Sequence, residues 1–331
     1  MPLVTLSSGI SFQSSRGTPI IEAARQAGIK LPYSCMTGRC STCKCRVLSG
    51  FTQKLRPEVG LTEREIDEGW VLGCVRAAES DTIIEISNLE NYDIPESRIW
   101  PCRIAEINRL ASDVLQVFLR LPPSAEFRFI PGQYINIIGK DGKKRSYSVA
   151  SAGSENKKIE IHVRAVKNGA MSNFWFNQAK VNDLLRFCGP LGTFFLRETR
   201  AVDIFFLATG TGIAPIKSML LSFEKFNQDK FPNSITILWG GRQLTDLYFD
   251  IYNILGAHTY VPVLSQPSKG WCGFKGYVQD ALIALHPNFM NARVYACGSD
   301  SMIKSSRNLL INKGLMPEHF YSDAFVSSGE Y

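Results

Sequence analysis

Short alternating runs of apolar and polar residues, with one helical pattern among them, occupy residues 1–93. The run VTLSSGISFQ predicts two strands joined by a tight turn, and TIIEI at 82–86 predicts a closing strand. Residues 18–28 predict a short helix, because a proline stands near its start and a glycine just past its end. We therefore expect a small α+β module, followed by a linker at 94–101, where periodicity is lost and two prolines occur.

Residues 102–197 show strand patterns with β-branched or alternating character, separated by Gly, Pro, Asn and Ser. Six such strands at regular spacing predict a small antiparallel β-barrel. The six runs are CRIAEINRL, VLQVFLRLP, QYINIIG, RSYSVAS, IEIHVRAV and LLRFCGP.

Strand patterns alternate with helical patterns over residues 198–331. The run AVDIFFLAT at 201–209 is almost continuously apolar, as expected for a parallel strand that is buried on both faces. The runs SITILWG, TYVPVLS and ARVYACGS follow as further strands. This layout predicts an α/β nucleotide-binding domain with a parallel sheet.

Composition narrows the function classes. The chain has 331 residues, 45% of them hydrophobic, and a formal net charge of +7. Its basic residues are dispersed among the strand patterns, which disfavours nucleic-acid binding and favours anionic small ligands such as nucleotides. The first residues lack a signal-peptide pattern, and no apolar run approaches the roughly 18 residues of a membrane span. We expect a soluble protein of a reducing compartment, the cytoplasm.

Four cysteines, Cys35, Cys40, Cys43 and Cys74, follow the spacing C-x4-C-x2-C with a distant fourth member. This is the spacing of plant-type [2Fe–2S] centres, in which four thiolates hold two irons. A structural zinc site is the alternative, although zinc sites usually pair their cysteines in two short knuckles. Disulfides are disfavoured in a chain of this length with 9 cysteines.

The loop around the first three cysteines suits a cluster. Gly38 and the small Ser41 and Thr42 let the backbone wrap closely, so that its N–H groups can point at cluster sulfurs. Cys45 is interpreted as a spare thiol, since the four-cysteine pattern is complete without it. Four other residues are interpreted as having no cofactor role, namely Cys102, Cys188, Cys272 and His162.

The segment 210–215, GTGIAP, joins a buried strand to a helix opened by proline. Such a turn allows close backbone approach to a pyrophosphate, and the helix N-terminus favours its charge. An ordinary strand–helix turn is the alternative. The spacing differs from the dinucleotide fingerprint of Rossmann dehydrogenases, and no acidic residue occupies the expected ribose position.

Together, the three segments resemble the ferredoxin–NAD(P)⁺ reductase-type flavoproteins that carry an N-terminal plant-type ferredoxin domain. The sequence RSYS at 145–148 matches the R-x-Y-S flavin motif of that family. The resemblance implies that Arg145 binds the flavin pyrophosphate, Tyr147 the ribityl chain and ring face, and that Ser148 hydrogen-bonds near flavin N5. Gly169 and Ser172 match the second pyrophosphate contact.

The resemblance also implies a nicotinamide site. Cys297 and Gly298 match a C-G pair beside the nicotinamide, although a small buried thiol at a strand end is the alternative for Cys297. Phe325 matches the aromatic residue that covers the flavin ring, a place for which Tyr331 could compete. Ser148, Cys297 and Phe325 are thus the implied catalytic residues. The turn for the nucleotide pyrophosphate comprises Gly210, Thr211, Gly212 and Pro215.

The implied domains are a [2Fe–2S] ferredoxin domain at 1–93, an FAD-binding barrel at 102–197 and an NAD(P)-binding domain at 198–331. NADH is the preferred nucleotide, but Arg242 could pair with a 2′-phosphate and so favour NADPH. Residues 132–134 and 189–193 also match family landmarks, and they suit barrel turns as well.

The resemblance implies that electrons pass from NAD(P)H through FAD and the cluster to a separate acceptor protein, bound transiently by a monomer. Segments outside the motifs resemble reductases of 3,6-dideoxysugar synthesis, and this resemblance implies that the acceptor is a dehydrase that deoxygenates C-3 of a CDP-sugar. The alternatives are an oxygenase component as acceptor and, from another class, a non-enzymatic iron–sulfur sensor or carrier. The segments that carry the preference are WPCR, RLPP, YVPV and SDAFV.

Overall fold

Two structural units divide the chain in a computed structural model that describes residues 1–139, 142–153, 157–252, 254 and 258–325. The first unit comprises Met1–Ile94 with Ser322–Ala324, and the second comprises Pro95–Tyr321 and the chain from Phe325. Within the described ranges, no helix combines the length and the apolar character that a membrane crossing requires.

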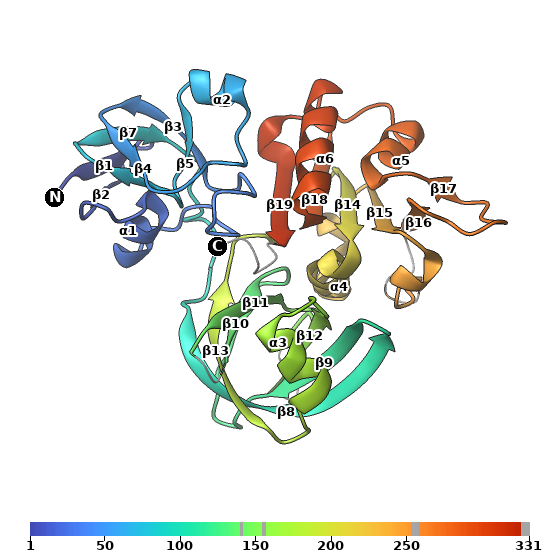
Figure 1. The fold of residues 1–331 in the computed structure, drawn as a ribbon. Coiled ribbons are helices and arrows are strands. Elements are labelled where there is room, and N and C mark those ends of the chain that lie inside the picture. Colours follow the sequence, from blue (N-terminus) through green and yellow to red (C-terminus); the bar gives the residue numbers. More distant parts are fainter. Residues whose placement is uncertain (140–141, 154–156, 253, 255–257, 326–331) are drawn as a thin grey trace. The chain divides into compact units, whose positions relative to one another are not determined.

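A five-stranded sheet with the order β2-β1-β7-β3-β5 forms the frame of the first unit (Figure 1). Helix α1 lies within the predicted helix at 18–28 and buries Ile20, Ile21 and Ala24 in the core of this unit. A capping box formed by Thr62 and Glu65 begins helix α2. The elements are β1 (Leu3–Leu6), β2 (Ser11–Gln13), α1 (Ile20–Gln26), β3 (Lys44–Ser49), β4 (Thr52–Lys54), α2 (Glu63–Asp67), β5 (Trp70–Leu72), β6 (Arg76–Ala78) and β7 (Thr82–Glu85).

Six antiparallel strands with the order β11-β10-β13-β8-β9-β12 form the first half of the second unit. A bridge between Val149 and Ile161 joins the two ends of this order, so the sheet closes on itself and the predicted six-stranded barrel is confirmed. The strands are β8 (Arg98–Ala111), β9 (Val114–Arg120), β10 (Tyr134–Ile138), β11 (Lys144–Ser148), β12 (Lys158–Arg164) and β13 (Leu184–Leu191).

Alternation explains how the barrel strands are buried. In β12, Ile159, Ile161 and Val163 enter the barrel core, while the residues between them point to the opposite face. A short helix α3 (Ala170–Asn173) continues as a π-helical turn, Phe174–Gln178, which buries Trp175 in the same core. Strand β8 begins at Arg98, inside the stretch 94–101 that the sequence presents as a linker.

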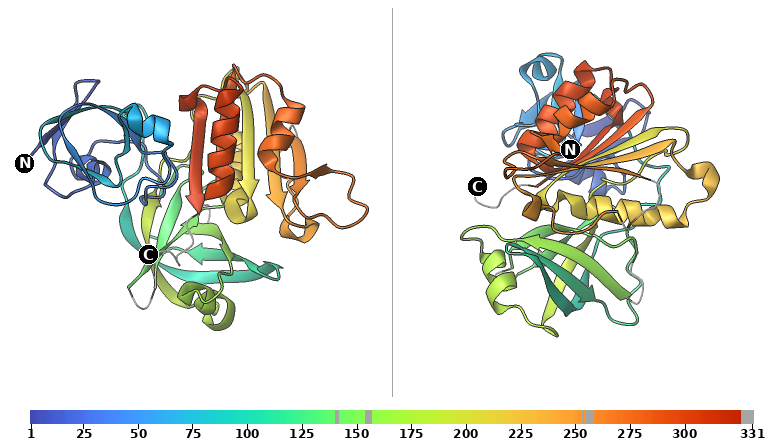
Figure 2. Two further views of the ribbon diagram at one scale, coloured as in Figure 1. Left: turned by 45° about the horizontal axis from the view of Figure 1, so that its top comes forward. Right: turned by 90° about the vertical axis from the view of Figure 1, so that its right-hand side faces the viewer.

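A sheet with the order β17-β16-β15-β14-β18-β19 forms the second half of this unit, and the pairings from β17 to β18 are parallel, as predicted. Helices α4 and α6 cover opposite faces of this sheet (Figure 2). The elements are β14 (Asp203–Thr209), α4 (Ile213–Ser222), β15 (Ser234–Gly241), β16 (Thr259–Leu264), β17 (Phe274–Lys275), α5 (Val278–Leu285), β18 (Ala292–Ser299), α6 (Asp300–Asn312) and β19 (Phe320–Phe325).

Candidate functional site

The cysteines of the C-x4-C-x2-C loop and the distant Cys74 lie as two pairs in the first unit. The thiols of Cys35 and Cys40 are hydrogen-bonded to each other, and so are those of Cys43 and Cys74. Within the described ranges, no three His, Cys, Asp or Glu side chains are grouped closely enough to hold one metal ion. Two pairs of thiols suit two irons better than a single zinc ion.

The surroundings of Cys35 favour a thiolate. Its Sγ accepts backbone N–H bonds from Thr37 and Cys40, each at 3.4 Å. The hydrogen bond with the Cys40 thiol, together with those from Thr37, lowers the pKa of Cys35 to about 5. Burial raises the pKa of Cys45 to about 12. The hydrogen bond with the paired thiol and burial also raise the pKa values of Cys40 and Cys43, so this shift does not separate Cys45 from the cluster cysteines.

Glycines at the cluster loop are required by close backbone contacts. A Cβ at Gly38 would lie 2.5 Å from the Pro57 carbonyl oxygen, and one at Gly60 would lie 2.6 Å from that of Arg39. The amide of Gly60 donates to the carbonyl of Gly38 at 2.9 Å. The segment 57–60 therefore packs directly against the backbone of the loop and fixes its path.

The residues of the flavin motif lie on β11, which pairs with β10 in the barrel. Ser148 is buried, and Arg145 and Tyr147 are half-buried. The indole Nε1 of Trp175 donates to the Tyr147 hydroxyl at 3.0 Å, which joins the motif to the segment that follows Gly169. Burial raises the pKa of Tyr147 to about 12, so its phenol stays neutral.

Gly169 precedes helix α3, and Ser172 lies in its first turn. The Ser172 Oγ accepts the backbone N–H of Val166 at 2.8 Å, which orients the hydroxyl and leaves its own proton available to an anion. The structure thus brings the predicted turn 169–172 and the β11 motif to one side of the barrel through the Tyr147–Trp175 contact.

The predicted nucleotide turn Gly210–Gly212 is a 3₁₀ turn that leads from β14 into α4. A Cβ at Gly212 would lie 2.1 Å from the Cys297 carbonyl oxygen, so β18 and the turn are in backbone contact. Gly298 has φ +149°, and a Cβ there would lie 2.1 Å from the Thr209 Oγ1. The structure therefore joins the GTG and C-G motifs, which are far apart in sequence.

The other predicted residues of the nucleotide site have different surroundings. Cys297 is fully buried in the core of the parallel-sheet domain, and Pro215 is buried in α4. Arg242 is exposed after β15, and its backbone N–H donates to Asp246. Phe325 is half-buried at the end of β19 and packs against the same core. Tyr331 lies outside the described residues.

Arg164, at the end of β12, is a candidate that the motifs did not reveal. Its guanidinium bonds Asp113 at 2.8 Å and Asp246 at 3.5 Å, and a Cβ at Gly210 would lie 2.5 Å from its Nη1. A permanent cation therefore lies directly against the nucleotide turn, where it can meet a phosphate charge.

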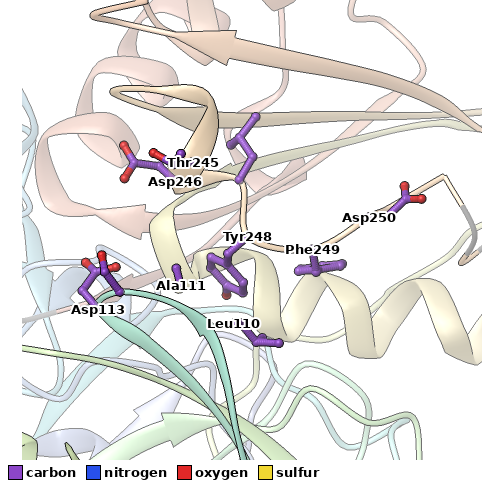
Figure 3. A pocket seen from close by; sticks show the side chains of 10 residues that line it. Leu110, Ala111, Asp113, Thr245, Asp246, Tyr248, Phe249 and Asp250 are labelled. Carbon is purple, nitrogen blue, oxygen red and sulfur yellow. The ribbon is translucent and has the colours of Figure 1, made fainter.

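A cavity of about 760 Å³ adjoins this arginine (Figure 3). Asp113 and Asp246, the two carboxylates that bond Arg164, line it together with Tyr248 and Phe249. Figure 3 shows that Leu110, Ala111 and Asp113 come from the end of barrel strand β8 and just after it, whereas Asp246, Tyr248 and Phe249 follow β15. The spacing of residues in the sequence does not reveal this cavity, because its two lining segments lie far apart along the chain.

His162 also has a defined place, on the outward face of β12. Its Nε2 lies 2.8 Å from Glu160 Oε1 and its Nδ1 lies 2.9 Å from the Tyr248 hydroxyl. Burial lowers the pKa of His162, so the ring is neutral, donates to Glu160 and accepts from Tyr248. It is a buried histidine with both nitrogens bonded, which agrees with the interpretation that it holds no cofactor.

The lowered pKa of His162 predicts a loss of stability in mild acid. The unfolded histidine takes up a proton as pH falls through about 6.5, while the folded one resists it, so folding stability falls with pH below that value. In His162→Gln, whose amide can make both hydrogen bonds but does not titrate, we expect a smaller fall in melting temperature between pH 7 and pH 5. Parallel acid melting curves for the two proteins would contradict this assignment.

Three family models match the chain in the order that the sequence predicts. They are the 2Fe-2S iron-sulfur cluster binding domain at residues 4–79, the oxidoreductase FAD-binding domain at 101–196 and the oxidoreductase NAD-binding domain at 206–308. The chain belongs to the family of NAD(P)H-dependent flavoprotein reductases that carry a ferredoxin-type domain. The predicted fold class, enzyme class and cofactors are thereby confirmed.

Known proteins match nearly the whole chain. The CDP-6-deoxy-L-threo-D-glycero-4-hexulose-3-dehydrase reductase of Yersinia pestis is 39% identical, over 97% of this chain and 97% of the relative. The reductase component DmpP of the phenol 2-monooxygenase of Pseudomonas sp. (strain CF600) is 31% identical, over 95% and 91%. Among solved structures, the Amycolatopsis cytochrome P450 reductase GcoB has a TM-score of 0.75 at 25% identity, with 99% of each chain covered.

Proposed function

We propose that this reductase delivers electrons to a CDP-6-deoxy-hexulose 3-dehydrase, in 3,6-dideoxysugar synthesis. The single observation that carries the proposal is the 39% identity to the dehydrase reductase of Yersinia pestis over 97% of both chains. The oxygenase reductase component DmpP is 31% identical. An oxygenase component is the second candidate acceptor, because such relatives also cover nearly the whole chain.

When bound, FAD accepts a hydride from NAD(P)H and passes single electrons to the [2Fe–2S] centre, from which the acceptor protein takes them. We assign Cys35, Cys40, Cys43 and Cys74 as the cluster ligands. Since the FAD- and NAD-binding oxidoreductase domains make the chain an enzyme, the alternative of a non-enzymatic carrier is set aside. We propose that the enzyme acts as a monomer. We also propose that it acts in the cytoplasm, because its nine free cysteines suit a reducing compartment.

The assignment of flavin contacts follows the motif on β11. We assign Arg145, with Gly169 and Ser172, to the pyrophosphate, and Tyr147 and Ser148 to the ribityl chain and ring. A planar cation fits a diphosphate, and the neutral Tyr147 phenol fits an uncharged ring face. Phe325 is assigned to cover that ring.

The assignment of nucleotide contacts follows the junction of β14, α4 and β18. We assign Gly210, Thr211 and Gly212, with Pro215 opening the helix, to the pyrophosphate, and we add Arg164 because its guanidinium lies against Gly210. Cys297 and Gly298 are assigned to the nicotinamide. NADH is the proposed donor, because the case for a 2′-phosphate contact rests on Arg242, an exposed residue that suits the pyrophosphate or a solvated loop equally well.

Replacement of Arg145 is expected to weaken FAD binding. In Arg145→Ala, the loss of charge-assisted hydrogen bonds to the pyrophosphate should weaken binding by roughly 10- to 100-fold. The measurement is the ratio of flavin absorbance to protein after dialysis, followed by titration with FAD. Lys144→Ala is the matched control, because Lys144 is the exposed neighbour on the opposite face of β11. Equal flavin retention in both variants would refute the assignment.

Reconstitution decides between the acceptors. The purified protein, loaded with FAD and iron–sulfur cluster, is mixed with the 3-dehydrase and, separately, with an oxygenase component, each with NADH or NADPH. We expect dehydrase turnover that depends on the reductase and is faster with NADH. If the oxygenase component turned over with the reductase and the 3-dehydrase did not, the oxygenase component would be the acceptor. Faster turnover with NADPH would overturn the nucleotide preference.

A further inference from the structure

The outward face of β12 carries the polar residues Glu160, His162 and Arg164, at alternate positions of the strand. Each bonds a residue of the parallel-sheet domain: Glu160 bonds Lys217 in α4, and the other two bond the segment after β15. Because strand side chains alternate, the residues between them fill the barrel core. One strand of the flavin barrel thus lies between that core and the nucleotide domain.

We propose that the buried Glu160–Lys217 pair positions the nucleotide turn against the flavin barrel and so sets the geometry of hydride transfer. This inference rests on the proposed cofactor contacts. The two residues are positioning residues: each acts through the element that carries it, and neither is assigned to a cofactor. The pair lies in the second structural unit, which contains both domains.

The Glu160 carboxylate has a full set of partners. Its Oε1 accepts from Lys217 Nζ at 2.6 Å, from Gln116 Nε2 at 2.7 Å and from His162 Nε2 at 2.8 Å. Its Oε2 accepts a second contact from Lys217 Nζ at 2.7 Å. The side chain of Glu160 is 6% exposed and that of Lys217 is 17% exposed. An ion pair that is largely shielded from water, with a carboxylate bonded from several directions, fixes direction as well as distance, which apolar contacts do not.

A second bond joins the same helix to the barrel. The Ser218 hydroxyl donates to the Ser151 carbonyl at 2.6 Å, and Ser151 Oγ accepts the Glu160 backbone N–H at 3.3 Å. Ser151 follows the flavin motif by three residues, and Lys217 follows the end of the GTG turn by five. The contacts therefore join the segment that follows β11 to the middle of α4. The two adjacent helix residues Lys217 and Ser218 make them.

This arrangement has a kinetic consequence. The assigned flavin contacts lie on the barrel, and the assigned nucleotide contacts lie on the parallel-sheet domain. The position of one domain relative to the other therefore sets the distance between the reacting atoms. A misplacement of about 1 Å in such a geometry can slow a reaction by about 100-fold. Loss of the pair is therefore expected to affect hydride transfer at saturating nucleotide more than nucleotide affinity.

The test compares Lys217→Met, Lys217→Arg and wild type as FAD-loaded proteins. In Lys217→Met we expect flavin reduction at saturating NADH to slow by roughly 10- to 100-fold, without a matching loss of NAD⁺ affinity by calorimetry. Amide hydrogen exchange over residues 210–222, measured on the oxidised protein, should rise. Lys217→Arg, which keeps the charge, should recover most of the rate. Lys304→Met, an exposed lysine of α6, is the matched control.

Two results would overturn the inference: a wild-type reduction rate in Lys217→Met, or a rate loss fully matched by lost NAD⁺ affinity. If Lys217→Met fails to fold, the double variant Glu160→Gln/Lys217→Met takes its place, because it leaves neither charge unpaired. The same two results would then overturn the inference. Failure of the proposed transfer from NADH to FAD has a different signature. In that case wild type and the Lys304→Met control would also fail to reduce flavin with NADH.

Discussion

Cys74→Ser is expected to lose its iron–sulfur centre while retaining FAD. A serine hydroxyl is a poor substitute for a thiolate ligand, and Cys74 supplies half of the Cys43–Cys74 pair. The electron paramagnetic resonance signal of the reduced protein should disappear, and cytochrome c reduction by NADH should fall to background. Reduction of ferricyanide, which can take electrons from flavin, should continue near the wild-type rate.

Cys45→Ala is the matched control for that experiment. Cys45 is fully buried in the same core and lies two residues after Cys43, but it is not one of the four cysteines of the C-x4-C-x2-C pattern with its distant fourth member. We expect Cys45→Ala to retain iron, the paramagnetic signal and cytochrome c reduction. Unchanged cytochrome c reduction in Cys74→Ser, or loss of iron in Cys45→Ala, would show that the ligand set is wrong.

Gly212→Ala is expected to abolish reduction of the flavin by NADH. The added Cβ would lie 2.1 Å from the carbonyl oxygen and 2.5 Å from the carbonyl carbon of Cys297, both backbone atoms that cannot swing aside. The turn or strand β18 must shift, and the assigned pyrophosphate and nicotinamide contacts shift with it. Anaerobic stopped-flow absorbance measures the reduction rate, and calorimetry measures NAD⁺ binding.

The flavin of Gly212→Ala should still bind and should still be reduced by dithionite, because the assigned flavin contacts lie on the barrel. Gly270→Ala controls for glycine replacement without a steric clash: its φ of +94° strains the new residue, but its added Cβ meets no atom within 4 Å. We expect Gly270→Ala to reduce its flavin with NADH at the wild-type rate. A Gly212→Ala protein that does the same would exclude the turn as the nucleotide site.

From the sequence alone, short motifs that encode local backbone geometry indicated an iron–sulfur centre and a nucleotide site, whereas FAD followed from the resemblance of RSYS at 145–148 to the flavin motif of the family. The spacing of Cys35, Cys40 and Cys43 implies a loop that wraps a cluster, and a glycine turn after a buried strand implies a nucleotide site. The barrel and the parallel sheet were also predictable, since alternation and continuous apolar runs reflect which faces are buried.

Only the tertiary structure decided how distant residues meet. Packing places Gly212 against Cys297 and puts Arg164 beside Gly210, although no spacing rule links these positions. In the sequence, Glu160 is a polar residue of an alternating strand pattern, and such residues usually face solvent. The structure shows that it faces Lys217 of another domain. Periodicity reports that a face is polar, but the identity of its partner depends on contacts between remote segments.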